Sequence, residues 1–359
     1  MMRREIGSEF WTGCQPNGGG TRILPALEDL RLVMSGRTAL DCVLFDFLRK
    51  RQAGKAYLPS YCCHTMIEPF LAHGFSVAFY EAYAGTDGIE FDLSAAADGD
   101  VVLLMEYFGF GSPALRPFAE TLRSSGKTVV FDATHSLLMP EYRAFSFPAD
   151  YIFGSVRKWT DINLGFCLKT SGPMIFPPLE PCPDYTALRN RAFDLKSAYI
   201  RGESDDKQTF LQMFSDAEDY LERHYRGKAA DERSLEHLSD LNADLLRGRR
   251  RENALCLTER INDLHSDEVK CLFPTVQPGD CPLFVPLATA TELRDALHAH
   301  LVQRGFYFPR HWPRTSEHTF RGERTPLFDT EISAVCDQRY TPEDMRRIAA
   351  EIGRFLTYV

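Results

Sequence analysis

Three residues that could do chemistry together lie at the ends of apolar segments in the middle of the chain. Asp132 ends the segment TVVFD, His135 follows it by one short turn, and Lys158 comes just after YIFGS. Lysine is almost never fully buried without a partner. Lys158 is therefore either a solvated residue at a strand exit or an amine placed to form a Schiff base, and we favour the second interpretation.

A second group of residues could bind a phosphate. The segment MSGRTAL reads as a glycine turn that opens a helix, and backbone N–H groups at a helix start bind anions. Gly36 would allow the turn, Arg37 could add a positive charge, and Thr38 could cap the helix or donate from its hydroxyl. Ser155, three residues before the lysine, could supply a further hydroxyl. A helix that starts this way is common, so this motif alone is weak.

Taken together, these residue types suit pyridoxal 5′-phosphate. Lys158 would anchor the cofactor and move a proton, and Asp132 would keep the pyridine nitrogen protonated so that the ring can accept an electron pair. His135 could stack on the ring or hydrogen-bond its phenolic oxygen. Taken singly, an aspartate after a strand is often only a turn or helix-capping residue.

The segments that must position these residues alternate between strands and helices. This alternation predicts an α/β domain with a mostly parallel central sheet and helices on both faces. In such a sheet, ligands bind beyond the carboxyl ends of the strands, where the candidate residues fall. The predicted strands are 55–60, 75–81, 100–109, 127–135 and 150–156, and the predicted helices are 36–52, 63–74 and 112–126.

The pattern changes in the last third of the chain. Residues 203–265 are charged and predicted to be almost continuously helical, and a strand, a helix, a strand and a final helix follow. We expect an N-terminal arm over 1–22, a large cofactor-binding domain over 23–245 and a smaller C-terminal α+β domain over 246–359.

Several segments resemble the DegT-type (DegT/DnrJ/StrS) family of pyridoxal-phosphate aminotransferases, the fold-type-I enzymes that aminate keto sugars attached to nucleotides. SGRTAL is similar to that family's SGTAAL phosphate turn, and VVFDATHSLL is similar to its EDAAH segment. SVRKWTDINLGFCLKT resembles its lysine segment, while LRDALHAHLVQRGFYFPRHWP and CDQRYTPEDMRRI resemble its C-terminal motifs. The resemblance implies that Lys158 carries the cofactor, with Asp132 on the pyridine nitrogen and His135 beside the ring. It also implies a homodimer with active sites at the subunit interface.

The chain departs from the family pattern in its expected pocket, which indicates a divergent branch. The spacing GSVRK is shorter than the family's FSFxPxK, and NLGF stands in place of GEGG. Glu106 replaces a histidine after the third strand, and Cys63 or His64 occupies the position of the aromatic residue that covers the outer face of the ring.

Three further residues are candidate substrate contacts. His311 in PRHWP could reach the substrate or could be a turn histidine between prolines. Tyr107 could line the pocket, although an aromatic residue after an apolar strand often belongs to the core. Arg157 could bind a substrate carboxylate or a second phosphate, or could be exposed.

Composition and charge exclude several classes of protein. The net charge of −9 argues against binding nucleic acid or an anionic membrane. The ten cysteines lack zinc-site spacing, so we expect no metal and no structural disulfide. The charged start MMRREIGSEFW is followed by no apolar segment, and no run of about 18 apolar residues suggests a membrane span. We therefore expect a cytoplasmic protein.

The leading hypothesis is an aminotransferase that moves an amino group from an amino acid to a keto group, with glutamate as the expected donor. The acceptor would be a sugar, including a nucleotide-linked sugar, or a related polar metabolite. A first alternative keeps the cofactor but makes the protein a decarboxylase, a lyase or a carbon–carbon bond-forming enzyme of secondary metabolism; Glu106 and the altered loop after Lys158 favour it. A second alternative is a protein that holds the cofactor without turnover.

Overall fold

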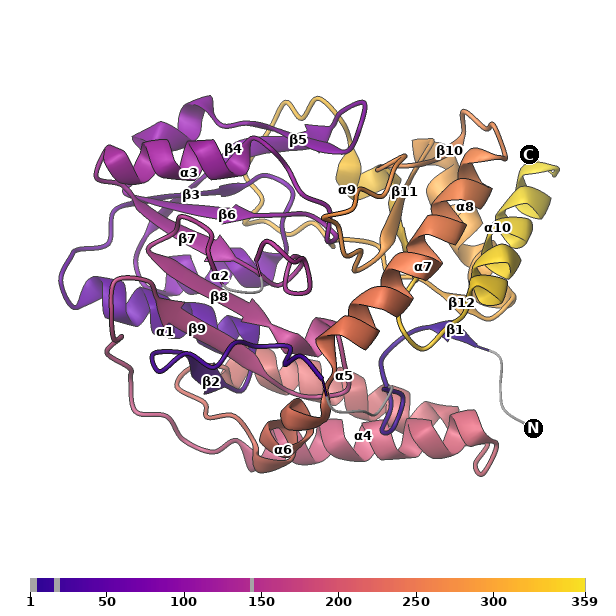
Figure 1. Ribbon diagram of the computed structural model, residues 1–359, viewed down its shortest axis with the longest axis horizontal. Helices are drawn as coiled ribbons and strands as arrows, with labels where there is room; N and C mark the ends of the chain where they lie inside the picture. The colour runs from indigo at the N-terminus through magenta and orange to yellow at the C-terminus, as the bar shows by residue number, and fades with distance from the viewer. Residues whose placement is uncertain (1–4, 16–19, 143–144, 359) are drawn as a thin grey trace.

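The computed structural model describes residues 5–15, 20–142 and 145–358. Its larger part is an eight-stranded sheet in the order β2-β9-β8-β7-β6-β3-β4-β5 (Figure 1). Strands β4, β3, β6, β7 and β8 run parallel, while β5, β9 and β2 are antiparallel to their neighbours. The strands are β2 Arg31–Val33, β3 Lys55–Pro59, β4 Ser76–Ala84, β5 Ile89–Asp92, β6 Val101–Met105, β7 Thr128–Asp132, β8 Tyr151–Ser155 and β9 Gly165–Lys169.

Helices cover both faces of this sheet, which explains why its inner strands are apolar throughout. On β6, Val101, Leu103 and Met105 belong to the core under α1 and α2, whereas Val102 and Leu104 belong to the core under α3. This arrangement confirms the predicted fold class. The covering helices are α1 Gly36–Leu48, α2 His64–Ala72 and α3 Leu115–Ser124, and a 3₁₀ turn, η1, covers Ser94–Asp98.

A pair of long helices, α4 Pro183–Arg201 and α5 Lys207–His224, lies beside the β2 side of the sheet (Figure 1). Phe193 of α4 packs against Phe210 and Phe214 of α5. The sequence pattern predicted helix only from residue 203. Helix α4 nevertheless has the usual signals, with a proline in its first turn and the left-handed Gly202 as its cap. Helix α6, Glu232–Asp240, follows the pair.

The C-terminal part has its own core around an antiparallel sheet in the order β10-β11-β13. Helix α7, Ala243–Asn262, joins the two parts, because Leu246 packs in the core of the large sheet and Leu257 packs in the C-terminal core. The boundary at 245/246 expected from the sequence therefore falls inside one continuous helix. The remaining elements are β10 Val269–Cys271, β11 Val285–Thr289, α8 Thr291–Gln303, β12 Phe306–Tyr307, α9 Leu327–Thr330, β13 Glu331–Ala334 and α10 Pro342–Leu356.

The start of the chain is built into the C-terminal part. Strand β1, Ile6–Gly7, pairs in parallel with β12, and the Gly7 N–H donates to the hydroxyl of Tyr340 at 2.8 Å (Figure 1). Residues 1–4 and 16–19 of the expected arm lie outside the described residues. Within the described part of the chain, no helix is long and apolar enough to cross a membrane.

Candidate active site

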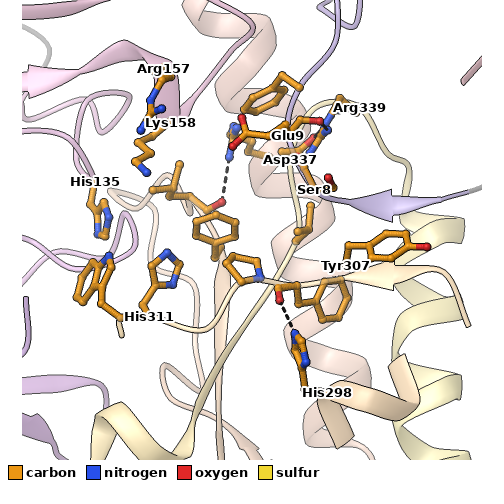
Figure 2. Close-up of a pocket in the computed structure, with 18 of the residues that line it drawn as sticks. Ser8, Glu9, His135, Arg157, Lys158, His298, Tyr307, His311, Asp337 and Arg339 are labelled. Carbon is orange, nitrogen blue, oxygen red and sulfur yellow. Dashed lines mark hydrogen bonds and ion pairs between the residues drawn. The ribbon is translucent and has the colours of Figure 1, made fainter. Parts of the chain in front are cut away.

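Two cavities meet at Lys158, which lies in the 3₁₀ turn η2, Val156–Lys158, directly after β8. The sheet-edge cavity, of about 190 Å³, lies beyond the ends of β7 and β8. The interdomain cavity, of about 420 Å³, lies between the two parts of the molecule. In Figure 2, His135, Arg157 and Lys158 lie along one side of the interdomain cavity, and Ser8, Asp337 and Arg339 lie along the other. The sheet-edge cavity is lined by, among others, Gly36, Arg37, Cys63, Asp132, Ser155 and Trp312.

The ε-amine of Lys158 has the environment of a reactive amine. Its side chain is exposed where it borders both cavities, and the surrounding protein atoms still exclude part of the water around its amine. This burial, together with the positive charge of Arg157, lowers the pKa of Lys158 below its ordinary value. The structure therefore favours a larger fraction of neutral, nucleophilic amine than a solvated lysine would have.

Asp132 lies at the end of β7, next to the strand that leads to Lys158. Its carboxylate is buried and accepts a hydrogen bond from the Thr134 N–H at 2.8 Å. Burial raises the pKa of Asp132 to about 6, although the hydrogen bonds from Thr134 and the charge of Lys158 act in the opposite direction. Among the residues that the structure describes, no cationic side chain pairs with this carboxylate, which suits a ligand that carries an N–H group.

The start of α1 forms a turn at the same cavity. Ser35 caps the helix, since its hydroxyl oxygen accepts the Thr38 N–H at 3.1 Å. Gly36, Arg37 and Ser155 line the cavity beside it. Nη1 of Arg37 is buried and has no hydrogen-bond partner among the described residues. A helix start and an unsatisfied guanidinium nitrogen together fit a bound phosphate.

Two glycines allow the close approach that shapes this turn. A Cβ at Gly36 would lie 3.0 Å from the Cβ of Ser155, and a Cβ at Gly165 would lie only 2.1 Å from the Ser35 carbonyl oxygen. Gly165 belongs to the NLGF segment that departs from the family pattern. Its position gives that segment a role in packing β9 against the turn.

Thr38 does not reach the cavity. Its hydroxyl donates to the carbonyl oxygen of Tyr225 at 2.8 Å and contacts the Ser35 hydroxyl at 2.9 Å. Thr38 therefore fixes the turn from behind, and its side chain is not placed to bind a phosphate.

His135 borders both cavities with a neutral ring. The Phe108 N–H donates to its Nδ1 at 3.1 Å, and burial, with the charges of His311 and Lys158, holds the pKa of His135 well below its usual range. The ring proton then lies on Nε2. The ring of Trp312 stacks against His135 at 5.9 Å and an interplanar angle of 20°. The pair forms a flat wall beside Lys158.

The structure separates the three candidate substrate contacts. His311 lines the interdomain cavity, with Nδ1 held 2.8 Å from the Ser333 hydroxyl. Arg157 lines both cavities and is paired with Glu218. Tyr107 lines neither cavity, because it is buried and donates its hydroxyl to the carbonyl oxygen of Tyr61.

Glu106 also lies away from both cavities. Its carboxyl group accepts hydrogen bonds from the Tyr142 hydroxyl at 2.5 Å and the Ser112 N–H at 2.9 Å. Burial raises the pKa of Glu106 to about 8, against the effect of these hydrogen bonds. This residue holds the loop after β6 and is not placed to contact a ligand in either cavity.

The interdomain cavity contains charged residues that the sequence patterns did not single out. Glu9 comes from the N-terminal arm and pairs with Arg189 at 3.1 Å. Arg339 binds both carboxylate oxygens of Asp337 and donates to the Glu9 carbonyl oxygen at 3.0 Å. The signal for three of the lining residues was present in the sequence, since Asp337 and Arg339 lie in the motif CDQRY and Trp312 lies in PRHWP. Glu9 carried no signal, because its position depends on the pairing of β1 with the distant β12.

Although burial opposes its ionisation, the charges of Arg189, Arg157 and Lys158 lower the pKa of Glu9 to about 2. The side of the cavity opposite Lys158 thus presents two ionised carboxylates, Glu9 and Asp337, each paired with an arginine. Among the described residues, no cluster of three His, Cys, Asp or Glu side chains could hold a metal ion.

Comparison with known proteins gives matches at the level of structure. No protein-family model and no curated protein sequence matches the chain. The aminotransferase TlmJ from Streptoalloteichus hindustanus is 17% identical over 92% of this chain and 86% of that chain, with a TM-score of 0.62. Helicobacter pylori PseC, an aminotransferase of pseudoaminic acid biosynthesis, is 14% identical over 94% and 89%, with a TM-score of 0.65. Spr1654 from Streptococcus pneumoniae, solved in its PLP form, is 14% identical over 90% and 86%, with a TM-score of 0.61. The chain therefore has the fold of these enzymes.

Proposed function

We propose that this chain is a pyridoxal-phosphate-dependent aminotransferase of the DegT type. It would move an amino group from an amino acid, with glutamate as the expected donor, to a keto group of a sugar or a related polar metabolite. One observation carries the proposal: Lys158 and Asp132 follow neighbouring parallel strands and open on one cavity, which also contains an anion-binding turn. When bound, the cofactor would supply an electron sink for the bonds at the substrate's α-carbon.

The side chains have separate tasks in this proposal. Lys158 holds the cofactor through its amine and later carries a proton between substrate and cofactor, for which its lowered pKa prepares it. Asp132 holds the proton of the pyridine nitrogen. Gly36, Arg37 and Ser155 hold the phosphate. Thr38 keeps the turn in place through its hydrogen bonds to Ser35 and Tyr225.

The interdomain cavity is proposed to bind the amino donor and acceptor. Its wall combines the carboxylate of Glu9 with the guanidinium group of Arg157 and the imidazole of His311. Such a mixture of donors and acceptors suits a hydroxylated polar molecule, and the structural similarity to the sugar aminotransferase CalS13 from Micromonospora echinospora supports a sugar. A nucleotide-linked sugar, a homodimer with shared active sites and a cytoplasmic location complete the proposal.

The alternative of a decarboxylase or lyase loses its two sequence arguments. Glu106 lies outside both cavities, and Gly165 of the altered loop packs against the phosphate turn. The spectroscopic experiment below separates these reactions and also tests the hypothesis of a protein without turnover.

The test is the absorbance spectrum of the purified full chain. We expect a visible band from bound cofactor that disappears on borohydride reduction, with the reduced cofactor attached to the peptide containing Lys158. L-Glutamate should convert the band to that of pyridoxamine phosphate. Lys158→Ala should abolish both responses, whereas Lys50→Ala, an exposed lysine far from the cavities, should change neither.

Two results would contradict the proposal. If the purified protein shows no such absorbance band, even after pyridoxal phosphate is added, the proposal that it binds this cofactor is wrong. A protein with the band, but with no conversion by glutamate or other common amino donors, would instead be a different cofactor enzyme or a binding protein.

A further inference from the structure

A cysteine opens on the sheet-edge cavity beside Lys158, and the proposed amino transfer does not use it. Cys63 directly precedes α2, is partly accessible and lines the cavity together with Asp132. Two other partly accessible cysteines, Cys14 and Cys256, line neither cavity. Cys63 therefore differs from them in its position.

Cys63 is the first member of a row of three interacting side chains. Its sulfur accepts the Thr65 hydroxyl at 3.2 Å, and the side chain of the adjacent His64 interacts with it closely enough to shift the pKa of both groups. Nε2 of His64 lies 2.9 Å from a carboxylate oxygen of Glu222 on α5. A thiol, an imidazole that can take its proton and a carboxylate that orients the imidazole form the arrangement that activates a cysteine nucleophile.

The charges around the row favour a thiolate. Burial opposes ionisation of Cys63, but the hydrogen bonds from His64 and Thr65 and the charge of Lys158 together lower its pKa. The hydrogen bond to Cys63 raises the pKa of His64 in turn. Other titratable or charged groups that act on these two residues are Arg37, Cys62, Glu222, Glu317 and His318. Because the thiolate is the reactive form of cysteine, this setting predicts a fast nucleophile.

The same cavity has a second feature that points to a ligand. Nη1 of Arg37 is buried without a hydrogen-bond partner among the described residues, on the wall that also holds Cys63. A molecule that enters to reach Arg37 therefore passes into the space that borders the thiolate and the amine of Lys158.

We infer that Cys63, with His64 and Glu222, makes this cavity a covalent acceptor for soft carbon electrophiles, such as an α,β-unsaturated carbonyl compound. The sulfur would form a bond to the β-carbon, the electron pair of the double bond would move toward the carbonyl oxygen, and the His64 imidazolium would return a proton to the α-carbon. With an α-haloamide, the same sulfur–carbon bond forms while the halide leaves with its electron pair. The location beside a cofactor rests on the proposed function, whereas the reactivity of the thiol does not.

The test measures alkylation of the full chain by iodoacetamide at pH 6.5, after bound cofactor has been removed. Peptide mass spectrometry gives the rate at Cys63 and, in the same sample, at Cys256 as a partly accessible control. We expect Cys63 to react at least about tenfold faster, as a thiolate does relative to an ordinary thiol near neutral pH. His64→Gln should bring Cys63 to the rate of Cys256, and Glu222→Gln should slow it by a smaller factor.

Equal rates at Cys63 and Cys256, or an unchanged Cys63 rate in His64→Gln, would overturn the inference. Thermal unfolding checks that each variant is folded. If His64→Gln does not fold, Glu222→Gln and the pH dependence of the wild-type rate give the same test. If the alkylation rate of Cys63 reaches its plateau at a pH below the pKa range of ordinary thiols, the thiol is activated. If the rate rises only at alkaline pH, activation is contradicted.

A final experiment distinguishes failure of this inference from failure of the proposed function. Added pyridoxal phosphate should slow alkylation of Cys63 and leave that of Cys256 unchanged. A fast Cys63 that the cofactor does not protect would overturn the location beside the cofactor and leave the activated thiol standing. If Cys63 is alkylated slowly in a protein that shows the expected cofactor band, the activation of the thiol is wrong and the proposed function is unaffected.

Discussion

The two cavities that meet at Lys158 are built in different ways. The sheet-edge cavity takes most of its walls from the ends of adjacent strands and from the starts of α1 and α2, and Leu221 of α5 and Trp312 complete it. The interdomain cavity takes its walls from the N-terminal arm, α7, the segment around β12 and the residues after β13, which are far apart in sequence. Pairing between neighbouring strands of one sheet fixes the first cavity, whereas the second depends on the pairing of β1 with the distant β12 and on ion pairs such as Arg189–Glu9.

Because of this difference, we expect the two cavities to serve different functions. Substitutions at the sheet edge should change cofactor binding and chemistry together. Substitutions in the interdomain cavity should change the response to substrates while the cofactor stays bound. The four predictions that follow test this difference between the cavities. It would be contradicted by a sheet-edge variant that changes only the response to substrate, or by an interdomain variant that loses the cofactor.

Asp132→Asn should have the largest effect. The amide keeps the size of the side chain but removes the charge that would hold the pyridine proton, so the rate of conversion by L-glutamate should fall by about 10²–10³-fold, the usual loss for one preorganised electrostatic group. Stopped-flow absorbance measures this rate. Asp161→Asn is the control, since Asp161 is buried in the same region and lines neither cavity. A near wild-type rate in Asp132→Asn would remove the carboxylate from the mechanism.

Gly165→Ala should weaken cofactor binding. The new methyl group would lie 2.1 Å from the Ser35 carbonyl oxygen, so the turn must move. Overpacking of this kind costs about 1–3 kcal/mol, and each 1.4 kcal/mol corresponds to a tenfold change in Kd. Titration of the cofactor-free protein with pyridoxal phosphate checks the prediction. Gly248→Ala, where a Cβ meets nothing within 4 Å, should bind as the wild type does.

Glu9→Gln should change the response to glutamate but leave the cofactor band intact. It removes a negative charge from the interdomain cavity, so the concentration of L-glutamate that gives half the maximal conversion rate should fall by about threefold to tenfold, or roughly 0.7–1.4 kcal/mol. Glu5→Gln is the matched control, because Glu5 lies in the same arm and pairs with Lys207 at 2.8 Å outside the cavity. Loss of the cofactor band in Glu9→Gln would contradict the division between the cavities.

Glu106→Gln should change neither cofactor binding nor the response to L-glutamate. Its effect should be limited to the pH dependence of the free energy of unfolding. The folded-state pKa of about 8 lies above the unfolded value, so the folded protein retains a proton between about pH 4.5 and 8 that the unfolded chain loses. Wild-type stability should therefore fall as pH rises through this interval, by at most about 1.4 kcal/mol per pH unit. In Glu106→Gln this contribution disappears, which denaturant unfolding at pH 5.5 and 7.5 can measure. An equal slope in both proteins would contradict the buried, protonated carboxyl group.

Most of the residues that the sequence singled out at the sheet edge line one cavity, because the signals that bring them together are local. Apolar strands end at Asp132 and Ser155, and parallel strands bring their carboxyl ends to one edge. Thr38 was assigned to phosphate binding because a cap and a ligand donor look alike in sequence. Its partner, the Tyr225 carbonyl, lies 187 residues away.

Residues of the interdomain cavity were harder to predict. Glu9 reaches this cavity only because β1 pairs with β12. Outside the interdomain cavity, Glu222 of α5 meets His64 of α2 through a contact that is also distant in sequence. No periodicity or motif encodes such contacts. Tyr107 was a candidate substrate contact, but it lies in the core, where the carbonyl oxygen of Tyr61 accepts its hydroxyl.

The pairing of β1 with β12 ties the beginning of the chain to its last third. Ile6 fills part of the C-terminal core, and α7 enters both cores. Neither half can therefore separate without exposing apolar surface that belongs to the other. On heating, the two halves should melt as one cooperative unit with a single calorimetric peak. A fragment that lacks the first ten residues should lose this cooperativity before it loses its secondary structure.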